Sequence, residues 1–375
     1  MNSNYFDTVI IGGGPSGSAC GITLQKQKTS CCIIDRKKFP RNKLCAGLLT
    51  TKTQKVIFDL LSPMNKEDIL KDITFAEEDH FKLYNKDKLL IDVELAPDML
   101  LVNRMQFDNY LLNYYKKLGG TTFEGEAVKD INFETKEVTL LNEQIIRYKY
   151  LVAADGANSI VGKYSHHQKS ENALCAEINI EREDLDIHGI KAYFNIVPES
   201  YAWVFSKGTQ ISIGMVKLPG KEFNLLNTFS GFLKLLGLNP DKYHTKGAML
   251  PFGNYLADPT YGNSVLFVGD AGGFVEPLTG EGIYYALKTG SLAGESILSG
   301  DPCITYRNSC KPIIKVMKNS NKYQKLFASK RFMKFFYKHI PKHGRFVRYF
   351  YNTHINKCST DCFIHTCLKY LLCDR

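Results

Sequence analysis

The sequence contains no run of about eighteen consecutive apolar residues, the length that a membrane-spanning helix requires. We expect no signal peptide, because the first apolar run begins at Tyr5. The 11 cysteines are odd in number and irregularly spaced, so they form no recognisable disulfide framework. Metalloprotease, P-loop and Ser-His-Asp signatures are absent. These absences predict a cytoplasmic protein whose cysteines stay reduced.

Length and charge describe a globular chain with an unusual C-terminal region. A chain of 375 residues, 44% hydrophobic and 23% charged, is typical of a globular protein with two domains. Residues 302–360 contain fourteen Lys or Arg and no Asp or Glu. Residues 361–375 hold two of each sign, which leaves 32 basic and 36 acidic residues in 1–301. The net charge of +10 therefore belongs to the C-terminal region.

The first glycine-rich stretch follows a short β-branched run and precedes a second apolar run that ends at Asp35. Gly12, Gly14 and Gly17 form the pattern G-x-G-x-x-G, which permits a tight turn, close approach of a pyrophosphate and close packing of helix on strand. Pro15 suits the first position of a helix, and the Asp35 carboxylate can accept hydrogen bonds from ribose hydroxyls. The stretch predicts dinucleotide binding without separating NAD from FAD.

A second glycine-rich stretch, VGDAGGFVEPLTGEGIYYAL at residues 268–287, favours a flavin. SVLFVGD predicts a buried strand that ends at Asp270, and a helix is expected to begin near Ile283. A ribityl chain needs an acceptor such as Asp270, and a helix N-terminus stabilises the negative charge of a reduced flavin ring. The alternative is a glycine-rich loop without a chemical role. Space for the ligand is expected at Gly272, Gly273, Gly280 and Gly282.

Four motifs in the expected order resemble the FAD-dependent geranylgeranyl reductase family, a branch of the group that includes the aromatic-ring flavin hydroxylases. GGGPSG and VGDAGGFVEPLTGEGI resemble the first and last FAD motifs. YLVAADGANSIVGK resembles the middle Asp-Gly motif, and VNRMQFDNYLL the helix start at Arg104. The resemblance implies FAD as cofactor, with contacts from Gly12, Gly14, Pro15, Ser16, Gly17, Asp35, Arg36, Arg41, Cys45, Ala46, Gly47, Arg104, Asp155, Gly156, Gly269, Asp270, Pro277, Gly280, Glu281, Gly282 and Ile283.

The resemblance also implies an α/β fold: a Rossmann-type FAD-binding domain with an inserted α+β antiparallel-sheet substrate domain and a helical C-terminal tail. Alternating runs at 189–197 and 209–218 predict antiparallel strands, and 223–237 predicts an amphipathic helix. The chain is assigned to an FAD-binding domain (residues 1–70, 100–165 and 260–300), a substrate domain (71–99 and 166–259) and a basic aromatic C-terminal helical region (301–375).

Cys45 is the first of two features that bear on the substrate. FPRNKLCAGLL, residues 39–49, resembles the Pro-Arg-x-Lys-x-Cys-Gly segment of the reductases, with Ala46 in place of the first glycine. The resemblance implies that Cys45 lies close to the flavin and the substrate. A free cysteine is commonly a small buried hydrophobe, whereas a nearby base or helix end makes it reactive. Its role stays open between proton donor and cavity wall.

The second feature is an aromatic strand in PESYAWVFSKG, residues 198–208, which resembles the family's Tyr-x-Trp-x-Phe-Pro-Lys motif with Ser206 in place of Pro. Tyr201, Trp203 and Phe205 alternate, so they would share one face of a strand. On residue types alone this face is typical of a packed core. In the family it lies above the flavin, where it suits a long apolar ligand.

We expect an FAD-dependent oxidoreductase that reduces carbon–carbon double bonds of a prenyl or similar lipid. Cys45 and Tyr201 are the candidate catalytic acids, and Trp203 and Phe205 the candidate substrate-binding walls. No second G-x-G-x-x-G is present, so electrons are expected from transiently bound NAD(P)H or a small redox protein. The alternatives are an FAD-dependent monooxygenase acting on an aromatic or apolar small molecule, and a non-catalytic flavoprotein.

The C-terminal region has three interpretations, because basic and aromatic residues alternate in KRFMKFFYKHIPKHGRFVRYFY at 330–351. We favour a helical tail packed on the FAD domain, then a peripheral contact with the inner membrane face, and nucleic acid last. The last four cysteines, at 358, 362, 367 and 373, match no zinc or iron–sulfur spacing, so no metal site is predicted.

Overall fold

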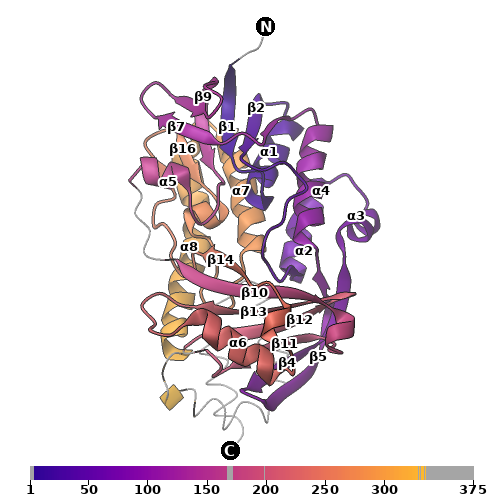
Figure 1. Ribbon diagram of the computed structural model, residues 1–375. Coiled ribbons are helices and arrows are strands. Elements are labelled where there is room, and N and C mark those ends of the chain that lie inside the picture. Colours follow the sequence, from indigo (N-terminus) through magenta and orange to yellow (C-terminus); the bar gives the residue numbers. More distant parts are fainter. Residues whose placement is uncertain are drawn as a thin grey trace, which may run out of the picture.

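The chain forms two eight-stranded sheets, one above the other in the view of Figure 1. The computed structural model describes residues 4–166, 172–197 and 199–327, together with 329, 331, 332 and 334. Helices pack beside the upper sheet, and one long helix runs down the side of the molecule past both sheets.

The first sheet contains five parallel strands in the order β16-β9-β1-β2-β6. In β1, Val9 and Ile11 pack into one core and Ile10 into another, which explains why the last three residues of the strand are all apolar. Antiparallel strands β15, β7 and β8 extend the sheet. The bounds are β1 Tyr5–Ile11, β2 Cys31–Asp35, β6 Thr121–Glu124, β7 Val128–Asn132, β8 Glu137–Leu140, β9 Ile145–Ala153, β15 Thr260–Tyr261 and β16 Val265–Phe267.

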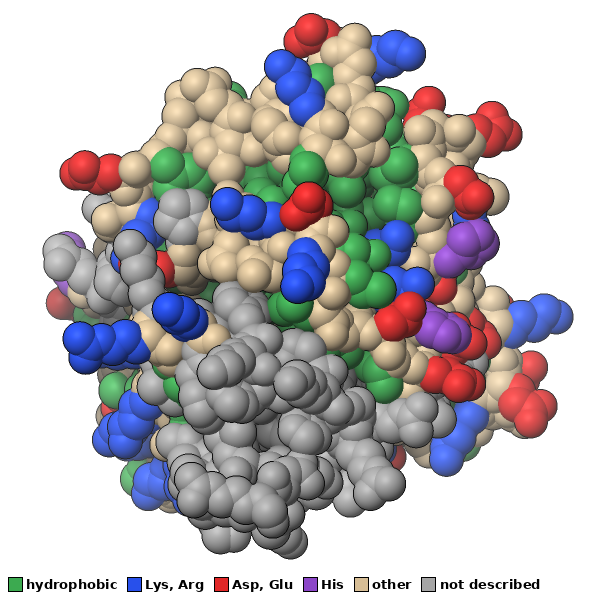
Figure 2. Space-filling view, turned by 90° about the horizontal axis from the view of Figure 1, so that it is seen from below, with side chains coloured by type: hydrophobic (Ala, Val, Ile, Leu, Met, Phe, Trp, Pro, Cys, Tyr) green, Lys and Arg blue, Asp and Glu red, His purple; other side chains and the backbone are tan. Residues whose placement is uncertain are grey.

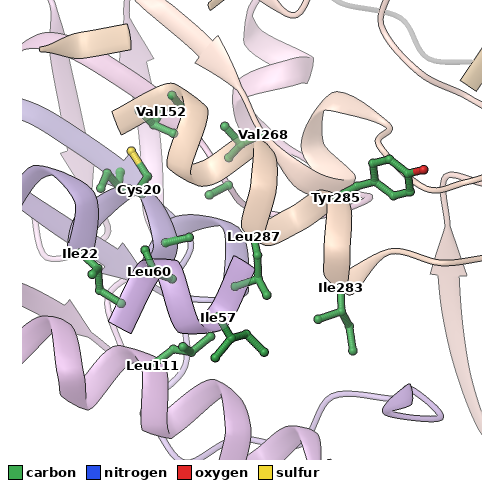
Figure 3. Packing of buried hydrophobic residues seen from close by; sticks show 14 of the residues in the cluster. Cys20, Ile22, Ile57, Leu60, Leu111, Val152, Val268, Ile283, Tyr285 and Leu287 are labelled. Carbon is green, nitrogen blue, oxygen red and sulfur yellow. The ribbon is translucent and has the colours of Figure 1, made fainter. Parts of the chain in front are cut away.

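Helices cover the face of this sheet that carries the larger core. Figure 3 shows Ile22, Leu60, Leu111 and Leu287 meeting there, each from a different helix. The helices α1 and α7 pack with little space between them, since a Cβ on Gly290 would lie 2.1 Å from the carbonyl oxygen of Ser16. The helices on this face are α1 Pro15–Lys26, α2 Thr51–Leu61, α3 Lys66–Ile73, α4 Arg104–Lys117 and α7 Ile283–Ile297. The short helix α5 Ile160–Tyr164 packs Val161 into the other core.

The second sheet has the order β14-β10-β13-β12-β11-β4-β5-β3. All of its pairs are antiparallel except β11 with β4, which joins segments far apart in the chain. Helix α6 packs Phe229, Phe232 and Leu233 on one face. The bounds are β3 Leu48–Leu49, β4 Ala76–Asn85, β5 Lys88–Leu101, β10 Ala173–Glu181, β11 Ile190–Phe194, β12 Tyr201–Lys207, β13 Gln210–Lys217, β14 Lys246–Leu250, α6 Leu225–Leu235, and the 3-10 turns η1 Arg182–Asp184 and η2 Pro240–Lys242.

The predicted fold class is confirmed, with differences at two places. The strand predicted to end at Asp270 ends at Phe267, because Gly269 adopts a φ of +52° and starts the 3-10 turn η3, Gly269–Gly272. The strand β3 lies inside the range 1–70 assigned to the FAD-binding domain, yet it belongs to the second sheet through its pairing with β5. The remaining strands of the second sheet lie within or next to the ranges 71–99 and 166–259.

Most of the described part of the C-terminal region forms one helix, α8 Pro302–Phe327. It is fastened to the first sheet by the Tyr306 hydroxyl, which donates to the Phe267 carbonyl at 2.8 Å. The aromatic stretch at 330–351 and the last four cysteines lie almost wholly outside the described residues, so their interpretations stay predictions. Within the described ranges, no helix is long and apolar enough to cross a membrane.

Candidate functional site

The glycine-rich turn between β1 and α1 has the tight geometry that the sequence predicts. Gly12 adopts a φ of +106°, and a Cβ there would lie 2.3 Å from the carbonyl oxygen of Ala154. A Cβ on Gly17 would lie 1.9 Å from the carbonyl oxygen of Gly12. Pro15 is the first residue of α1, as predicted. The turn therefore brings the N-terminus of α1 to the edge of the sheet, where the N–H groups of a first helical turn can bind an anion.

A cleft of about 840 Å³ runs along this edge. Asp35 lines it at the end of β2, where its two oxygens accept hydrogen bonds from the N–H groups of Gly13 and Lys37, both at 2.8 Å. The cleft collects most of the predicted cofactor residues: Gly12, Gly14, Pro15, Ser16, Asp35, Arg36, Arg41, Cys45, Arg104, Asp155, Gly156, Asp270, Gly280, Gly282 and Ile283.

A buried carboxylate that the sequence did not single out holds the two predicted arginines. Asp108 is fully buried and accepts from Arg104 Nε at 2.8 Å and Nη2 at 2.9 Å. Arg41 Nη1 lies 3.1 Å from the same carboxylate. Burial alone would lower the pKa of Arg104, but Asp108 raises it above its ordinary value. The cluster carries a net charge of +1 beside the glycine-rich turn, which suits an anionic ligand.

Asp155 supplies a further acceptor in the cleft. Its Oδ2 accepts from the N–H of Ile160 at 2.6 Å, at the start of α5. Its Oδ1 is buried and accepts no hydrogen bond from the described residues. Burial raises the pKa of this carboxyl, while hydrogen bonds from Ser159 and the backbone lower it. A Cβ on the neighbouring Gly156 would meet no atom within 4 Å, so the wall is open here.

The opposite wall comes from η3 and α7. Helix α7 begins at Ile283, as predicted, with Gly282 as its N-cap. Gly272 and Gly273 do not clear space for a ligand, contrary to expectation. A Cβ on Gly272 would lie 2.5 Å from the Phe274 ring, and one on Gly273 would lie 1.9 Å from the carbonyl oxygen of Asn254. These two glycines allow protein segments to approach each other.

Six predicted cofactor residues do not line the cleft. Gly17 and Gly269 are buried at the packing of α1 with its surroundings. Pro277 is buried near Gly253. Ala46, Gly47 and Glu281 line a second cavity instead.

The second cavity, of about 220 Å³, is largely apolar and adjoins the cleft. The three alternating aromatics, Tyr201, Trp203 and Phe205, all line it from β12. Cys45 lines both the cleft and the cavity, so it lies at their junction. The N–H of Gly47 donates to Cys45 Sγ at 3.4 Å. The structure therefore brings together all the residues predicted to catalyse or to bind substrate.

Two ionic interactions in or beside the cavity wall were not predicted from the sequence, although Glu281 itself was expected to contact the cofactor. Glu281 pairs with Lys52 Nζ at 2.5 Å and accepts from Thr50 Oγ1 at 2.9 Å. Burial raises the pKa of Glu281, and Lys52 opposes this shift. Lys52 Nζ also lies 4.8 Å from the centre of the Tyr284 ring. Only the position of Glu281 inside a glycine-rich motif could have indicated this pair.

The other interaction connects the aromatic strand to the Cys45 segment. Trp203 Nε1 donates to Ser212 Oγ at 3.2 Å, which donates to Glu177 Oε1 at 3.1 Å. Lys207 Nζ donates to the carbonyl oxygen of Cys45 at 2.9 Å. Burial raises the pKa of Glu177 and lowers that of Lys207, and the attraction between the two charges opposes both shifts. The Cys45 carbonyl is thus fixed by a buried lysine.

The hydroxyl of Tyr201 donates to the carbonyl oxygen of Thr279 at 2.7 Å. Burial raises the pKa of Tyr201 above its ordinary value, so the phenol keeps its proton. Among the described residues, no group of three His, Cys, Asp or Glu side chains could hold a metal ion. Fold and site together define a Rossmann-type flavoprotein with an apolar cavity beside its dinucleotide cleft.

Comparisons with known proteins agree with this class. A family model described as an FAD binding domain matches residues 5–207. An uncharacterised protein of Methanosarcina barkeri is 31% identical over 304 residues, covering 80% of this chain and 76% of that protein. The digeranylgeranylglycerophospholipid reductase of Methanocaldococcus jannaschii is 28% identical over 315 residues, covering 78% and 77%. The chain belongs to the FAD binding domain family, and it is similar to proteins of the geranylgeranyl reductase group.

Solved structures share the fold at low identity. A geranylgeranyl bacteriochlorophyll reductase-like protein from Thermoplasma acidophilum superposes with a TM-score of 0.71 at 19% identity, covering 86% of this chain and 88% of that one. A probable FAD-dependent monooxygenase from Pseudomonas aeruginosa gives 0.65 at 13% identity, covering 88% and 98%. The fold is thus common to reductases and monooxygenases.

FAD is the cofactor, and the cleft fits it. The glycine-rich turn and the net positive Arg41–Arg104–Asp108 cluster suit a pyrophosphate, and the unpaired Oδ1 of Asp155 suits a hydroxyl donor. The protein is an FAD-dependent oxidoreductase.

Proposed function

We propose that this oxidoreductase reduces carbon–carbon double bonds of a prenyl or similar lipid. The observation that carries the proposal is the apolar cavity beside the FAD cleft, with Cys45 at their junction. An isoprenoid chain fits walls of this kind, because Tyr201, Trp203 and Phe205 offer aromatic surface and few polar groups. Two relatives whose names specify geranylgeranyl substrates support this substrate class.

The residues of the chain would position the substrate and supply a proton. Reduced FAD supplies the hydride for one alkene carbon. The other carbon needs a proton, and Cys45 and Tyr201 are our candidate acids among the ionisable residues that line the cavity. Lys207 holds the Cys45 segment in place through its carbonyl oxygen. The apolar wall excludes water, which would compete for a carbon centre with cationic character. NAD(P)H or a small redox protein would supply the electrons.

The test is anaerobic. The bound flavin is reduced, a geranylgeranyl lipid is added, and the return of the oxidised absorbance band is followed together with the mass of the product. We expect the band to return with formation of a saturated product. Cys45→Ala should retain FAD and slow this return by about 10²-fold or more. Cys175→Ala is the matched control, because Cys175 also lines both cavities but lies outside the motif.

Two outcomes would contradict the proposal in different ways. An unchanged rate in Cys45→Ala removes Cys45 as the acid while leaving the reductase activity in place. A flavin that stays reduced until oxygen is admitted, with oxygen consumed in step with a hydroxylated product, identifies a monooxygenase instead. A flavin that no donor reduces indicates a structural or sensing role.

A further inference from the structure

Five lysines form a row along one side of α8. They follow one another at alternating intervals of four and three residues, which places them on a single side of a helix, and all five are exposed. Residues 302–327 contain no Asp or Glu, so no acidic side chain of α8 neutralises these lysines. Figure 2 shows Lys and Arg side chains gathered at its left edge, the side on which α8 lies in Figure 1. The lysine row consists of Lys311, Lys315, Lys318, Lys322 and Lys325.

The direction of the lysine row is fixed by contacts on the other side of α8. Ile313 and Met317 are buried in the core of the first sheet. Near the far end, Asn321 Nδ2 donates to the carbonyl oxygen of Gly253 at 3.0 Å, and Tyr323 packs on a hydrophobic cluster of the second sheet. The helix is therefore attached to both halves of the molecule.

The same helix forms part of the wall of the apolar cavity. Val316 and Tyr323 line that cavity together with Tyr201 and Cys45. One side of α8 thus bounds the cavity while another presents lysines to solvent.

We propose that the lysine row binds the surface of a bilayer that contains anionic lipid. The row from Lys311 to Lys325 is about 21 Å long, so all five charges can face one plane. Anionic headgroups attract lysines near a membrane, at about fivefold in affinity for each. A nucleic acid or an acidic protein offers the same charge, but only a membrane also supplies apolar ligands for the cavity that α8 bounds. The supply of cavity ligands from the membrane rests on the proposed function, whereas binding of the lysine row to vesicles does not.

The test uses the full-length holoprotein and vesicles of phosphatidylcholine with or without phosphatidylserine. Flotation should show binding to the vesicles that contain phosphatidylserine, little binding to neutral ones, and release as salt rises. A triple variant, Lys311→Gln with Lys318→Gln and Lys322→Gln, should bind about a hundredfold more weakly.

A matched control removes the same charge elsewhere. Lys71, Lys117 and Lys234 are exposed on α3, α4 and α6, and their triple replacement by Gln should change vesicle binding only a fewfold. Equal loss in both triple variants would overturn the proposal, since binding would then follow net charge alone. Failure of the wild-type protein to bind vesicles that contain phosphatidylserine would also overturn the proposal. If it instead binds duplex RNA through the lysine row, the surface is a nucleic-acid site.

Flavin reoxidation by a detergent-dispersed geranylgeranyl lipid separates this proposal from the proposed function. The lysine variant should retain the wild-type rate, because the row lies outside the cavity. Vesicle binding without reoxidation would refute the reductase alone, and reoxidation without vesicle binding would refute the membrane surface alone.

Discussion

Replacing Gly214 by Ala tests whether the cavity wall is as tightly packed as the structure indicates. Gly214 lies opposite Trp203 in the β12–β13 ladder, and a Cβ there would lie 2.2 Å from Trp203 Cζ2. The indole has to move, and the cavity that it lines offers space for it. Overpacking of this kind costs about 1–3 kcal/mol, and losing the hydrogen bond to Ser212 adds about 1 kcal/mol. Removing a strand glycine returns about 0.5–1 kcal/mol.

The expected net result is a loss of about 2 kcal/mol in the free energy of unfolding, measured by urea denaturation in excess FAD. The displaced indole should also slow lipid-driven flavin reoxidation. Gly231→Ala is the matched control. Gly231 is an exposed residue in the middle of α6, and a Cβ added to it would meet no atom within 4 Å. That change should stabilise the protein slightly.

A double variant locates the cause. Trp203→Phe in the Gly214→Ala background shortens the ring system, so the two changes should cost less together than the sum of their separate costs. If Gly214→Ala unfolds at the same urea concentration as the wild type, the close contact between Gly214 and Trp203 is refuted. Additive costs would show that the destabilisation arises elsewhere.

Two further predictions concern buried ionisable groups. Asp108→Asn should destabilise the protein by about 3–5 kcal/mol in urea denaturation, because Arg104 and Arg41 lose their common counter-charge. Asp59→Asn, the same change at an exposed position of α2, should have little effect, and equal stability of the two variants would contradict the role of Asp108. The raised pKa of Tyr201 means that the phenol stays protonated up to and beyond pH 10, so Tyr201→Phe should slow flavin reoxidation by a constant factor from pH 6 to pH 10. If the wild-type reoxidation rate falls between pH 8 and pH 10 and the rate of Tyr201→Phe does not, the raised pKa of Tyr201 is refuted.

The parts of the site that sequence predicts well are those with local causes. Pro15 and Ile283 begin their helices as expected, since glycine and proline act on the backbone within a few residues. Asp35 ends its strand because the apolar run stops there. The shared face of the aromatic strand is equally predictable, because alternation along a strand places Tyr201 and Trp203 on the same side.

The features of the site that could not be predicted depend on contacts between residues far apart in the sequence. Lys52 and Glu177 are single charged residues within an ordinary helix and strand, and their partners lie far away in the sequence. Asp108 follows Arg104 by four residues on α4, a spacing typical of an ion pair, but its contact with Arg41 comes from a distant segment. The glycines were ambiguous for a similar reason. A glycine in a motif indicates that another group lies close to its Cα. Only the fold shows that at Gly273 this group is the backbone of Asn254 and not a ligand. The strand end at Phe267 was missed because the φ of Gly269 is not visible in the sequence.

The interleaving of the two sheets constrains how the chain is made. Strand β3 enters the second sheet near residue 48, the parallel pair of β4 with β11 joins it to much later segments, and β16 completes the parallel set of the first sheet at Phe267. Both sheets therefore stay open until most of the chain has left the ribosome. Non-local pairing of this kind slows folding and exposes unpaired strand edges meanwhile. The strands of the two sheets alternate along the chain, so no continuous fragment contains one complete sheet without strands of the other, and the flavin cleft cannot be separated from the apolar cavity by cutting the chain.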